Sequence, residues 1–440
     1  MKKATSPVEA GRIPGALKQT PFALEDLIDL RDPLQEHLRS KVTELITSLF
    51  DAQIDDAIGA ERYAREARGG YRHGHRERSL TTSLGRAELL LPRARVFNAD
   101  GSTQEFRSDL LRHYQRRSAE VDGSILMSYL GGENTRRVQK ALEPMLKGAS
   151  ISKSSVSRVV QQLKRSFDKW RVRPLGEHRI AFLFLDAIVV RVKVDRRSQE
   201  MSVLVALGVH ETGERELLGL KLVTGESKEA WKEFIEGLAT RDLRAPALCV
   251  IDGNAGLRKA IAATWPSMPV QRCTVHKLRN LETHCPKTAF GEMNADYKAI
   301  FDAPSPKAGR AAYDRFVKIW RARCPSVAES FLEAGEELLT HFRFPRSQWK
   351  ALRTTNAIER LLEEFRRRVK TQGSLPSESS VLCLFYGLWA SGQVQLRKMN
   401  GWEDIKVVIA TRAAATSMGP ASDRDSAANM GSAGRTRAAA

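Results

Sequence analysis

Long apolar runs are absent from this chain of 440 residues. No stretch approaches the roughly 18 consecutive apolar residues that read as a membrane-spanning helix. The opening residues, Met1 to Ser6, are followed by polar sequence rather than by the apolar core of a signal peptide. We therefore expect no membrane association and a cytoplasmic location.

Cysteine is scarce as well, with five residues in the whole chain. An odd number spread over a long sequence favours reduced thiols over a disulfide framework. The fold must then rest on a packed core, and an apolar content of 42% is sufficient for one.

Acidic residues are too few to balance the basic ones, since 52 acids face 71 bases and the formal net charge is +19. Such an excess is typical of a protein that binds a polyanion. DNA is the first candidate partner, because the basic residues are scattered through folded-looking segments rather than gathered on one amphipathic membrane-binding helix.

Clear periodicity is missing at both ends, so residues 1–30 and 411–440 are expected to be disordered. Residues 31–117 begin with apolar side chains at helical spacing and continue into short extended pieces. Between residues 61 and 117 there are thirteen arginines, no lysine and seven acids. We interpret this region as a helical, arginine-rich DNA-binding module, with candidate contacts at Arg72, Arg76 and Arg78.

A second DNA-binding element is predicted over residues 118–175. Two amphipathic stretches are joined at residues 147–152 by Gly and Ser, which end one helix and cap the next. The second stretch is typical of the recognition helix in a helix-turn-helix, with Lys153 and Arg158 facing DNA. An ordinary helical hairpin remains the alternative, because such patterns are frequent by chance.

From residue 176 the pattern changes to three strands, a helix, a strand and a helix. This order predicts an α/β sheet layered with helices. Its first part would be residues 176–275 and its last part residues 351–410, separated by an all-helical insertion over residues 276–350.

Asp186 lies within one of the most apolar runs of the chain. Burying an unpaired carboxylate costs several kcal/mol, so the residue needs a cation, a hydrogen-bond network or access to solvent. The structural alternative is an aspartate that pairs with a nearby arginine or faces water from a half-exposed strand.

Two further acids stand at element boundaries. Asp252 ends a predicted strand, where an Asp-Gly turn or a helix cap is the structural alternative. Glu359 lies in the helix predicted from Asn356, at the position of a capping-box glutamate. Glu363, one turn further on the same face, competes with Glu359 for a catalytic role.

Together these acids supply the oxygen ligands that hard divalent ions prefer. Two Mg²⁺ or Mn²⁺ ions, roughly 3.5 to 4 Å apart, would serve an in-line phosphodiester displacement. The basic half of the last helix would hold DNA phosphates beside them, the alternative being a solvated charged face. Its basic residues are Arg366, Arg367, Arg368 and Lys370.

Five segments, in order, resemble motifs of the Mutator-type bacterial insertion-sequence transposases. They are Leu185-Asp-Ala-Ile-Val-Val-Arg-Val-Lys, Gly225-Glu-Ser-Lys-Glu-Ala-Trp231, Val250-Ile-Asp-Gly-Asn-Ala-Gly-Leu, Gln271-Arg-Cys-Thr-Val-His276 and Thr355-Asn-Ala-Ile-Glu-Arg360-Leu. The resemblance covers residues from about 35 to 410 and implies an Asp-Asp-Glu triad on an RNase H-like fold. It favours Glu359 over Glu363 and adds Asn356 and Arg360 as DNA contacts, while Leu362 departs from the polar residue expected there.

Cys273 and His276 have the spacing of half a zinc site, and His284 and Cys285 could complete four ligands. The resemblance implies no structural metal. We therefore expect Cys273, His276 and Trp231 to have packing or hydrogen-bonding roles beside the site.

The combined prediction is a nucleoid-associated DDE transposase that binds the terminal inverted repeats of an insertion sequence and its target DNA. It would cleave 3′ ends and transfer strands as a homodimer on DNA, and the resemblance implies a replicative route through a DNA circle. The alternatives are a catalytically silent DNA-binding regulator on the same scaffold, and a nuclease or resolvase without strand transfer.

Overall fold

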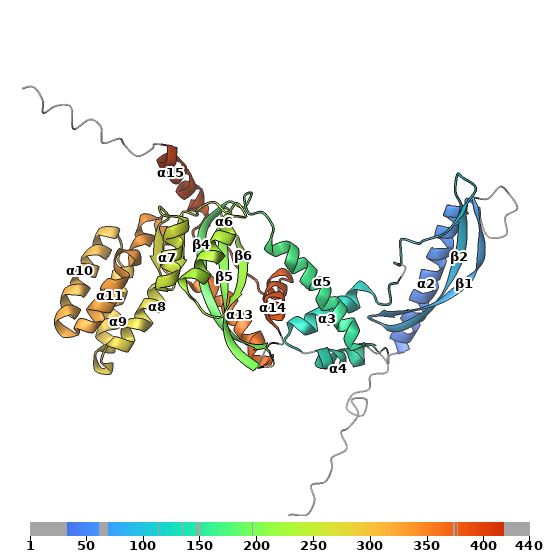
Figure 1. The fold of residues 1–440 in the computed structure, drawn as a ribbon, viewed down its shortest axis with the longest axis horizontal. Helices are drawn as coiled ribbons and strands as arrows, with labels where there is room; N and C mark the ends of the chain where they lie inside the picture. The colour runs from blue at the N-terminus through green and yellow to red at the C-terminus, as the bar shows by residue number, and fades with distance from the viewer. Residues whose placement is uncertain are drawn as a thin grey trace, which may run out of the picture. The chain divides into compact units, whose positions relative to one another are not determined.

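The computed structural model describes residues 33–60, 69–112, 114–133, 135–146, 149, 151–195, 197–372, 375 and 377–417 (Figure 1). Contacts divide the chain into two compact units, residues 1–125 with 139–152 and residues 126–138 with 153–440. The end predicted to be disordered over residues 1–30 lies outside the described residues. The prediction for residues 411–440 is wrong at its start, because helix α15, Ile405–Ser417, continues into it.

The first unit combines a long helix with an antiparallel three-stranded sheet of order β1-β2-β3. Helix α2 packs on β2 through Phe50, Ile54 and Ile58. The helix and the extended character predicted for residues 31–117 are both present, but the extended part forms two strands of 13 residues rather than short pieces. The elements are α2 (Pro33–Ile58), β1 (Gly70–Thr82), β2 (Gly85–Phe97) and β3 (Thr103–Glu105).

The segment predicted as a helix-turn-helix is helical. Its elements are α3 (Ala119–Leu130), α4 (Thr135–Leu146) and α5 (Lys153–Arg171). Helix α4 lies mostly in the first unit and α5 in the second, so the two helices do not belong to one compact unit. DNA recognition by α5 stays a prediction.

The second unit is built on a five-stranded sheet of order β6-β5-β4-β7-β8. Strands β4, β5 and β6 pair antiparallel, whereas β7 and β8 run parallel to β4. The four strand segments predicted from apolar runs all form part of this sheet, whereas its fifth strand, β8, was not predicted. The strands of the sheet are β4 (Ile180–Val194), β5 (Arg197–His210), β6 (Arg215–Val223), β7 (Leu248–Ile251) and β8 (Val270–Arg272).

Helices cover both faces of this sheet. On one face, α6 and α7 bury a core that includes Trp231 and Phe234. On the other face, α13 and α14 pack with part of α5 around Phe365 and Phe385, whose rings stack 3.9 Å apart. These covering helices are α6 (Lys228–Ala239), α7 (Ala255–Thr264), α13 (Asn356–Gln372) and α14 (Glu378–Ala390).

Between β8 and α13 the chain is helical and has a core of its own, which contains Tyr297, Phe316, Trp320 and Phe331. In Figure 1 these helices gather beside the sheet. They are α8 (Thr274–His284), α9 (Phe290–Phe301), α10 (Pro306–Arg323), α11 (Pro325–Ala334) and α12 (Trp349–Leu352), with 3₁₀ turns between them. Across the described part of the chain, no helix is both long and apolar enough to span a bilayer.

Candidate active site

Asp186 is the one aspartate in the core of the sheet. It lies in the middle of β4, opposite Val205 of β5, and only 9% of its surface is exposed. Its Oδ1 accepts a hydrogen bond of 2.8 Å from the Ala187 N–H. Among the described residues no lysine or arginine forms an ion pair with it, so the structural alternative of an arginine partner does not explain this carboxylate.

The pKa of Asp186 is raised to about 7, chiefly by burial and to a smaller extent by the negative charges of Asp252 and Glu359. The backbone hydrogen bond and the nearby His276 act in the opposite direction but do not cancel these effects. The sheet therefore contains a carboxylate whose negative charge is only weakly neutralised by the protein and which lies near two other acids.

Asp252 follows the last residue of β7 directly. Leu185 of β4 pairs with Ile251 of β7, so Asp186 and Asp252 are the next residues on two neighbouring parallel strands. Asp252 Oδ1 accepts the Asn254 N–H at 3.0 Å, while Asn254 itself caps α7 by accepting from the Leu257 N–H. Since Asn254 is the cap, the capping alternative does not account for Asp252.

The turn after Asp252 requires glycine. Gly253 has a φ of +118°, which side-chain-bearing residues rarely adopt. A Cβ at this position would also lie 2.3 Å from the Arg272 guanidinium. Arg272 is itself buried and pairs with Glu333 of α11 at 3.1 Å.

Glu359 reaches the same place from α13. The helix packs on β4 through Ile358, Leu361 and Leu362, all fully buried, which explains the apolar residue at position 362. The partner of Glu359 Oε1 is His276 Nε2 at 3.4 Å, rather than a backbone N–H of the first helical turn. Glu363, by contrast, is exposed to solvent.

Cys273, His276 and Thr355 form a network behind Glu359. The Thr355 N–H and Oγ1 both contact Cys273 Sγ at 3.3 Å, and Thr355 Oγ1 lies 3.3 Å from His276 Nδ1. Burial would raise the pKa of Cys273, but hydrogen bonds from His276 and Thr355 lower it. The hydrogen bond between His276 and Cys273, together with the negative charges of Asp186 and Glu359, raises the pKa of His276 to about 9.

This network places positive charge next to the three acids. Helix α8 separates the two pairs that a zinc site would need, because Cys273 and His276 lie at its first turn, whereas His284 and Cys285 lie at its far end. Over an 11-residue helix that separation is roughly 15 Å. The four side chains therefore do not form one site, and Thr355 is the partner that the spacing of cysteine and histidine did not reveal.

The acids suit a divalent cation by chemistry, since their oxygens are hard ligands and the burial of Asp186 leaves negative charge to be neutralised. Among the described residues, however, the one group of three potential ligands within 4.8 Å of one another is His178, His210 and Glu216. Glu216 there accepts hydrogen bonds from His178 Nδ1 at 2.7 Å, His210 Nε2 at 2.8 Å and Arg173 at 2.7 Å. Because an arginine already neutralises the Glu216 carboxylate, we assign these three residues a structural role rather than a metal-binding one.

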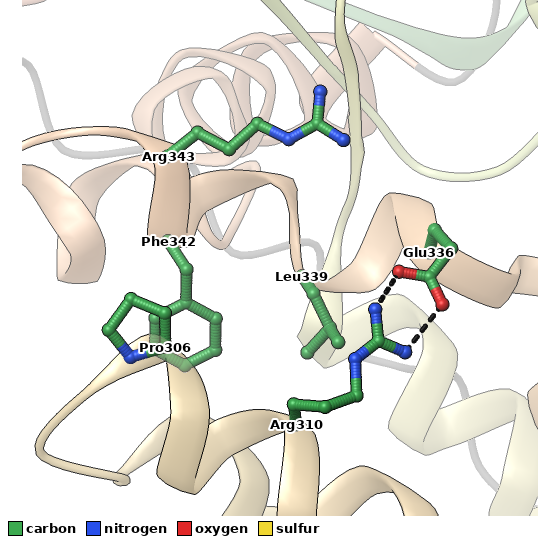
Figure 2. Close-up of a pocket in the computed structure, with 6 residues that line it drawn as sticks. All are labelled: Pro306, Arg310, Glu336, Leu339, Phe342 and Arg343. Carbon is green, nitrogen blue, oxygen red and sulfur yellow. Dashed lines mark hydrogen bonds and ion pairs between the residues drawn. The ribbon is translucent and has the colours of Figure 1, made fainter.

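A pocket of about 230 Å³ lies in the helical segment and contains none of these acids. Figure 2 shows Arg310 and Glu336 beside one another at the pocket, joined by two hydrogen bonds. Arg343 also lines the pocket. None of the candidate catalytic acids does, so we do not assign the active site to this pocket.

The predicted DNA contacts fall into two sets. Seven are exposed to solvent: Arg76, Lys153, Arg158, Asn356, Arg360, Arg366 and Lys370. Of these, Arg158 also donates a hydrogen bond of 3.3 Å to the Ser154 carbonyl. The others have partners inside the protein. Arg72 pairs with Asp51 and Asp55 of α2, Arg78 donates to the carbonyls of Arg112 and Gln115, Arg367 pairs with Glu364, and Arg368 lies 3.4 Å from Gln393. Arg72 and Arg78 therefore brace the first unit, which the charge count alone did not indicate.

Comparison with known proteins identifies relatives over most of the chain. The family model "Transposase, Mutator family" matches residues 19–397. The transposase of insertion element ISRM5 from Rhizobium meliloti (strain 1021) is 32% identical over 372 residues, covering 84% of this chain and 90% of that protein. The transposase of IS256 in transposon Tn4001 from Staphylococcus aureus is 33% identical over 341 residues, covering 77% and 85%. The transposase of IS1081 from Mycobacterium tuberculosis is 31% identical over 381 residues, covering 86% and 90%.

Among solved structures, the Drosophila P element transposase strand transfer complex gives a TM-score of 0.28 at 11% identity, covering 73% of this chain and 89% of that one. A score this low establishes no shared fold. The sequence matches, however, confirm the resemblance that the five motifs indicated, and the chain belongs to the Mutator family of transposases.

Proposed function

We propose that this protein cuts and joins DNA strands during transposition of an insertion sequence, with Asp186, Asp252 and Glu359 as its catalytic acids. The observation that carries the proposal is the approach of three acids from β4, the end of β7 and α13. Burial, with smaller contributions from the charges of Asp252 and Glu359, raises the pKa of Asp186 to about 7. A carboxylate whose pKa is raised this far often belongs to a functional site.

The proposed core is RNase H-like, formed by the five-stranded sheet and α13, with the helices between β8 and α13 as an insertion. Its antiparallel strands β4 to β6 and the added parallel strands β7 and β8 support this assignment. The sheet gives Asp186 and Asp252 a rigid base, and packing of α13 on β4 fixes the third acid against it.

The acids would hold Mg²⁺ or Mn²⁺, as a pair of ions that activates the attacking oxygen and stabilises the leaving oxygen. Asp186 and Asp252 present oxygens from adjacent strands, and His276 orients Glu359 through its Nε2. Arg366 and Lys370, exposed further along α13, would bind the phosphates that flank the cleaved bond. Water attacks first, and the freed 3′-hydroxyl then attacks a second phosphodiester.

The arginine-rich first unit and α5 would bind the terminal inverted repeats. Exposed Arg76, Lys153 and Arg158 are the proposed contacts there. Because two element ends must be joined in concert, we propose that the protein acts as a dimer on DNA.

The test is cleavage and joining of a supercoiled plasmid that carries the element's own ends, with Mg²⁺, with Mn²⁺ and with EDTA. Glu359→Gln is compared with Glu363→Gln, which removes the same charge one turn away at an exposed position. We expect metal-dependent joined products with wild type and Glu363→Gln, and none with Glu359→Gln. Cleavage by Glu359→Gln would remove that residue from the triad, and tight binding without breakage under any metal would favour a silent regulator.

A further inference from the structure

Helix α2 carries a row of apolar side chains on the side that faces away from its sheet. Leu38, Leu45 and Leu49 are 42%, 57% and 43% exposed, and Val42 between them is half-buried. The other side of the helix packs on β2 through a cluster that includes Phe50 (Figure 1). Single exposed leucines are ordinary on a protein surface, but a continuous row of them indicates an interaction surface. We call these four residues the α2 row.

The spacing of the α2 row fits a second helix of the same kind. Its members follow one another at intervals of four, three and four residues, as the a and d positions of a coiled coil do. In that pattern Val42 and Leu49 occupy a positions, while Leu38 and Leu45 occupy d positions. Such a row is self-complementary, because each side chain inserts between four residues of a facing helix with the same repeat. A second copy of α2 is therefore the occupant that the row matches.

The charges around the α2 row favour a protein partner over DNA. Helix α2 contains five acids and two bases, whereas the whole chain has a net charge of +19. Lys41, beside the row, pairs with Glu44 at 2.8 Å. Further along the helix, Asp51 and Asp55 pair with Arg72 of β1. The helix therefore does not attract phosphate, and two copies of a basic protein can approach one another here with little repulsion.

The length of α2 sets the size of such an interface. A helix of 26 residues is about 39 Å long and about 12 Å wide, so two that pair along their length cover on the order of 1,000 Å² in total. This area is at the lower limit for a specific interface. Association of free copies should therefore be reversible and of modest affinity. Copies held on one DNA molecule should pair more completely, because their effective concentration is higher.

We propose that two copies of this chain associate through α2, with the α2 row of one copy packed against that of the other. The inference deepens the proposed function and rests on it for its purpose, since a contact between copies would bring two element ends together before strands are joined. It makes dimer formation a property of the protein rather than of the DNA alone.

The test measures sedimentation equilibrium of the full chain from about 1 to about 100 μM, without DNA or metal. Leu45→Glu places a charge in the middle of the α2 row, at a side chain that is 57% exposed and so contributes little to the core. Leu90→Glu is the matched control, because Leu90 of β2 is 52% exposed and lies between two residues that face α2. We expect a reversible dimer in wild type and in Leu90→Glu. The dissociation constant of Leu45→Glu should be at least about 10-fold larger, the effect of losing a central interface residue.

Two results would overturn the proposal. Equal association of all three proteins would place the dimer contact on another surface. A wild-type chain that stays monomeric up to about 100 μM would mean that something else covers the α2 row, either residues 1–32 of the same chain or a different protein. Because neither DNA nor metal is present, both results leave the catalytic proposal standing, whose own failure is an absence of plasmid cleavage.

A second measurement uses wild type alone and so does not depend on folding of Leu45→Glu. Hydrogen exchange of the backbone amides is compared at about 1 and about 100 μM, since exchange reports local opening of each element. We expect exchange over residues 38–52 to slow at the higher concentration, while exchange in β1 and β2 stays unchanged. Slowing confined to another element, or no slowing at all, would contradict association through α2.

Discussion

Two acids of the same sheet have opposite electrostatic surroundings. Burial would raise the pKa of Glu216 on β6, but hydrogen bonds from His210, Arg173 and His178 bring it down to about 2. Asp186 on β4 has one hydrogen bond from a backbone N–H, and its pKa rises to about 7. The structural acid Glu216 is in direct contact with an arginine, whereas no lysine or arginine of the described residues contacts Asp186, which we propose binds an ion from solution.

The largest effect expected from this comparison is on catalysis. Asp186→Asn keeps the size of the side chain but removes the negative charge, so strand cleavage is expected to fall to background. Removal of a poorly compensated buried charge should not lower the free energy of unfolding. Plasmid cleavage, a DNA mobility shift and urea unfolding measure the three properties, and loss of stability together with activity would mean that Asp186 is a structural acid like Glu216.

The next effect is on the pH dependence of stability in the metal-free protein. An acid whose folded pKa is raised from 3.8 to about 7 keeps its proton in the folded state, so folding loses stability as pH rises between those values. At about 1.4 kcal/mol per pKa unit, wild type should lose about 2 kcal/mol more than Asp186→Asn between pH 5 and pH 7. Urea unfolding in EDTA at both pH values measures this, and added Mg²⁺ should shrink the difference. Equal pH dependence of the two proteins would contradict the raised pKa.

The smallest effect is on stability alone. Glu216→Gln leaves Arg173, whose side chain is 19% exposed, without its acid and should lower the free energy of unfolding by about 2 kcal/mol. Glu214→Gln is the control, since Glu214 is 65% exposed and lies 3.9 Å from Lys398. Cleavage should persist in both variants. If Zn²⁺ stabilised wild type but not Glu216→Gln, the group of His178, His210 and Glu216 would be a metal site after all.

The sheet of the second unit was predictable because its strands are nearly continuous apolar runs. The apolar run of β7 ends directly before Asp252 and the glycine turn. The long strands β1 and β2 were less visible. Their outward positions carry Arg76, Glu77 and Glu88, so charge obscured the alternation of buried Ala87, Leu89 and Leu91. Alternation with a period of two residues was the available signal.

The candidate acids could be named from motifs, but their surroundings could not. Contact between Thr355 and Cys273 joins residues 82 apart, and neither spacing nor composition indicates it. The same holds for the pairing of Arg72 with α2, which only tertiary packing determines. Leu362 was a departure from the expected helix pattern in sequence and is a fully buried core residue in the structure.

The contact between Gly253 and Arg272 affects the order in which this protein folds. The Arg272 guanidinium occupies the space beside the Asp252 turn and is held there by Glu333, which also binds Lys277 at 2.9 Å. Glu333 belongs to α11, some 80 residues further along the chain. The turn is therefore braced only after α11 has packed, so we expect an incompletely folded chain to lack an organised candidate site.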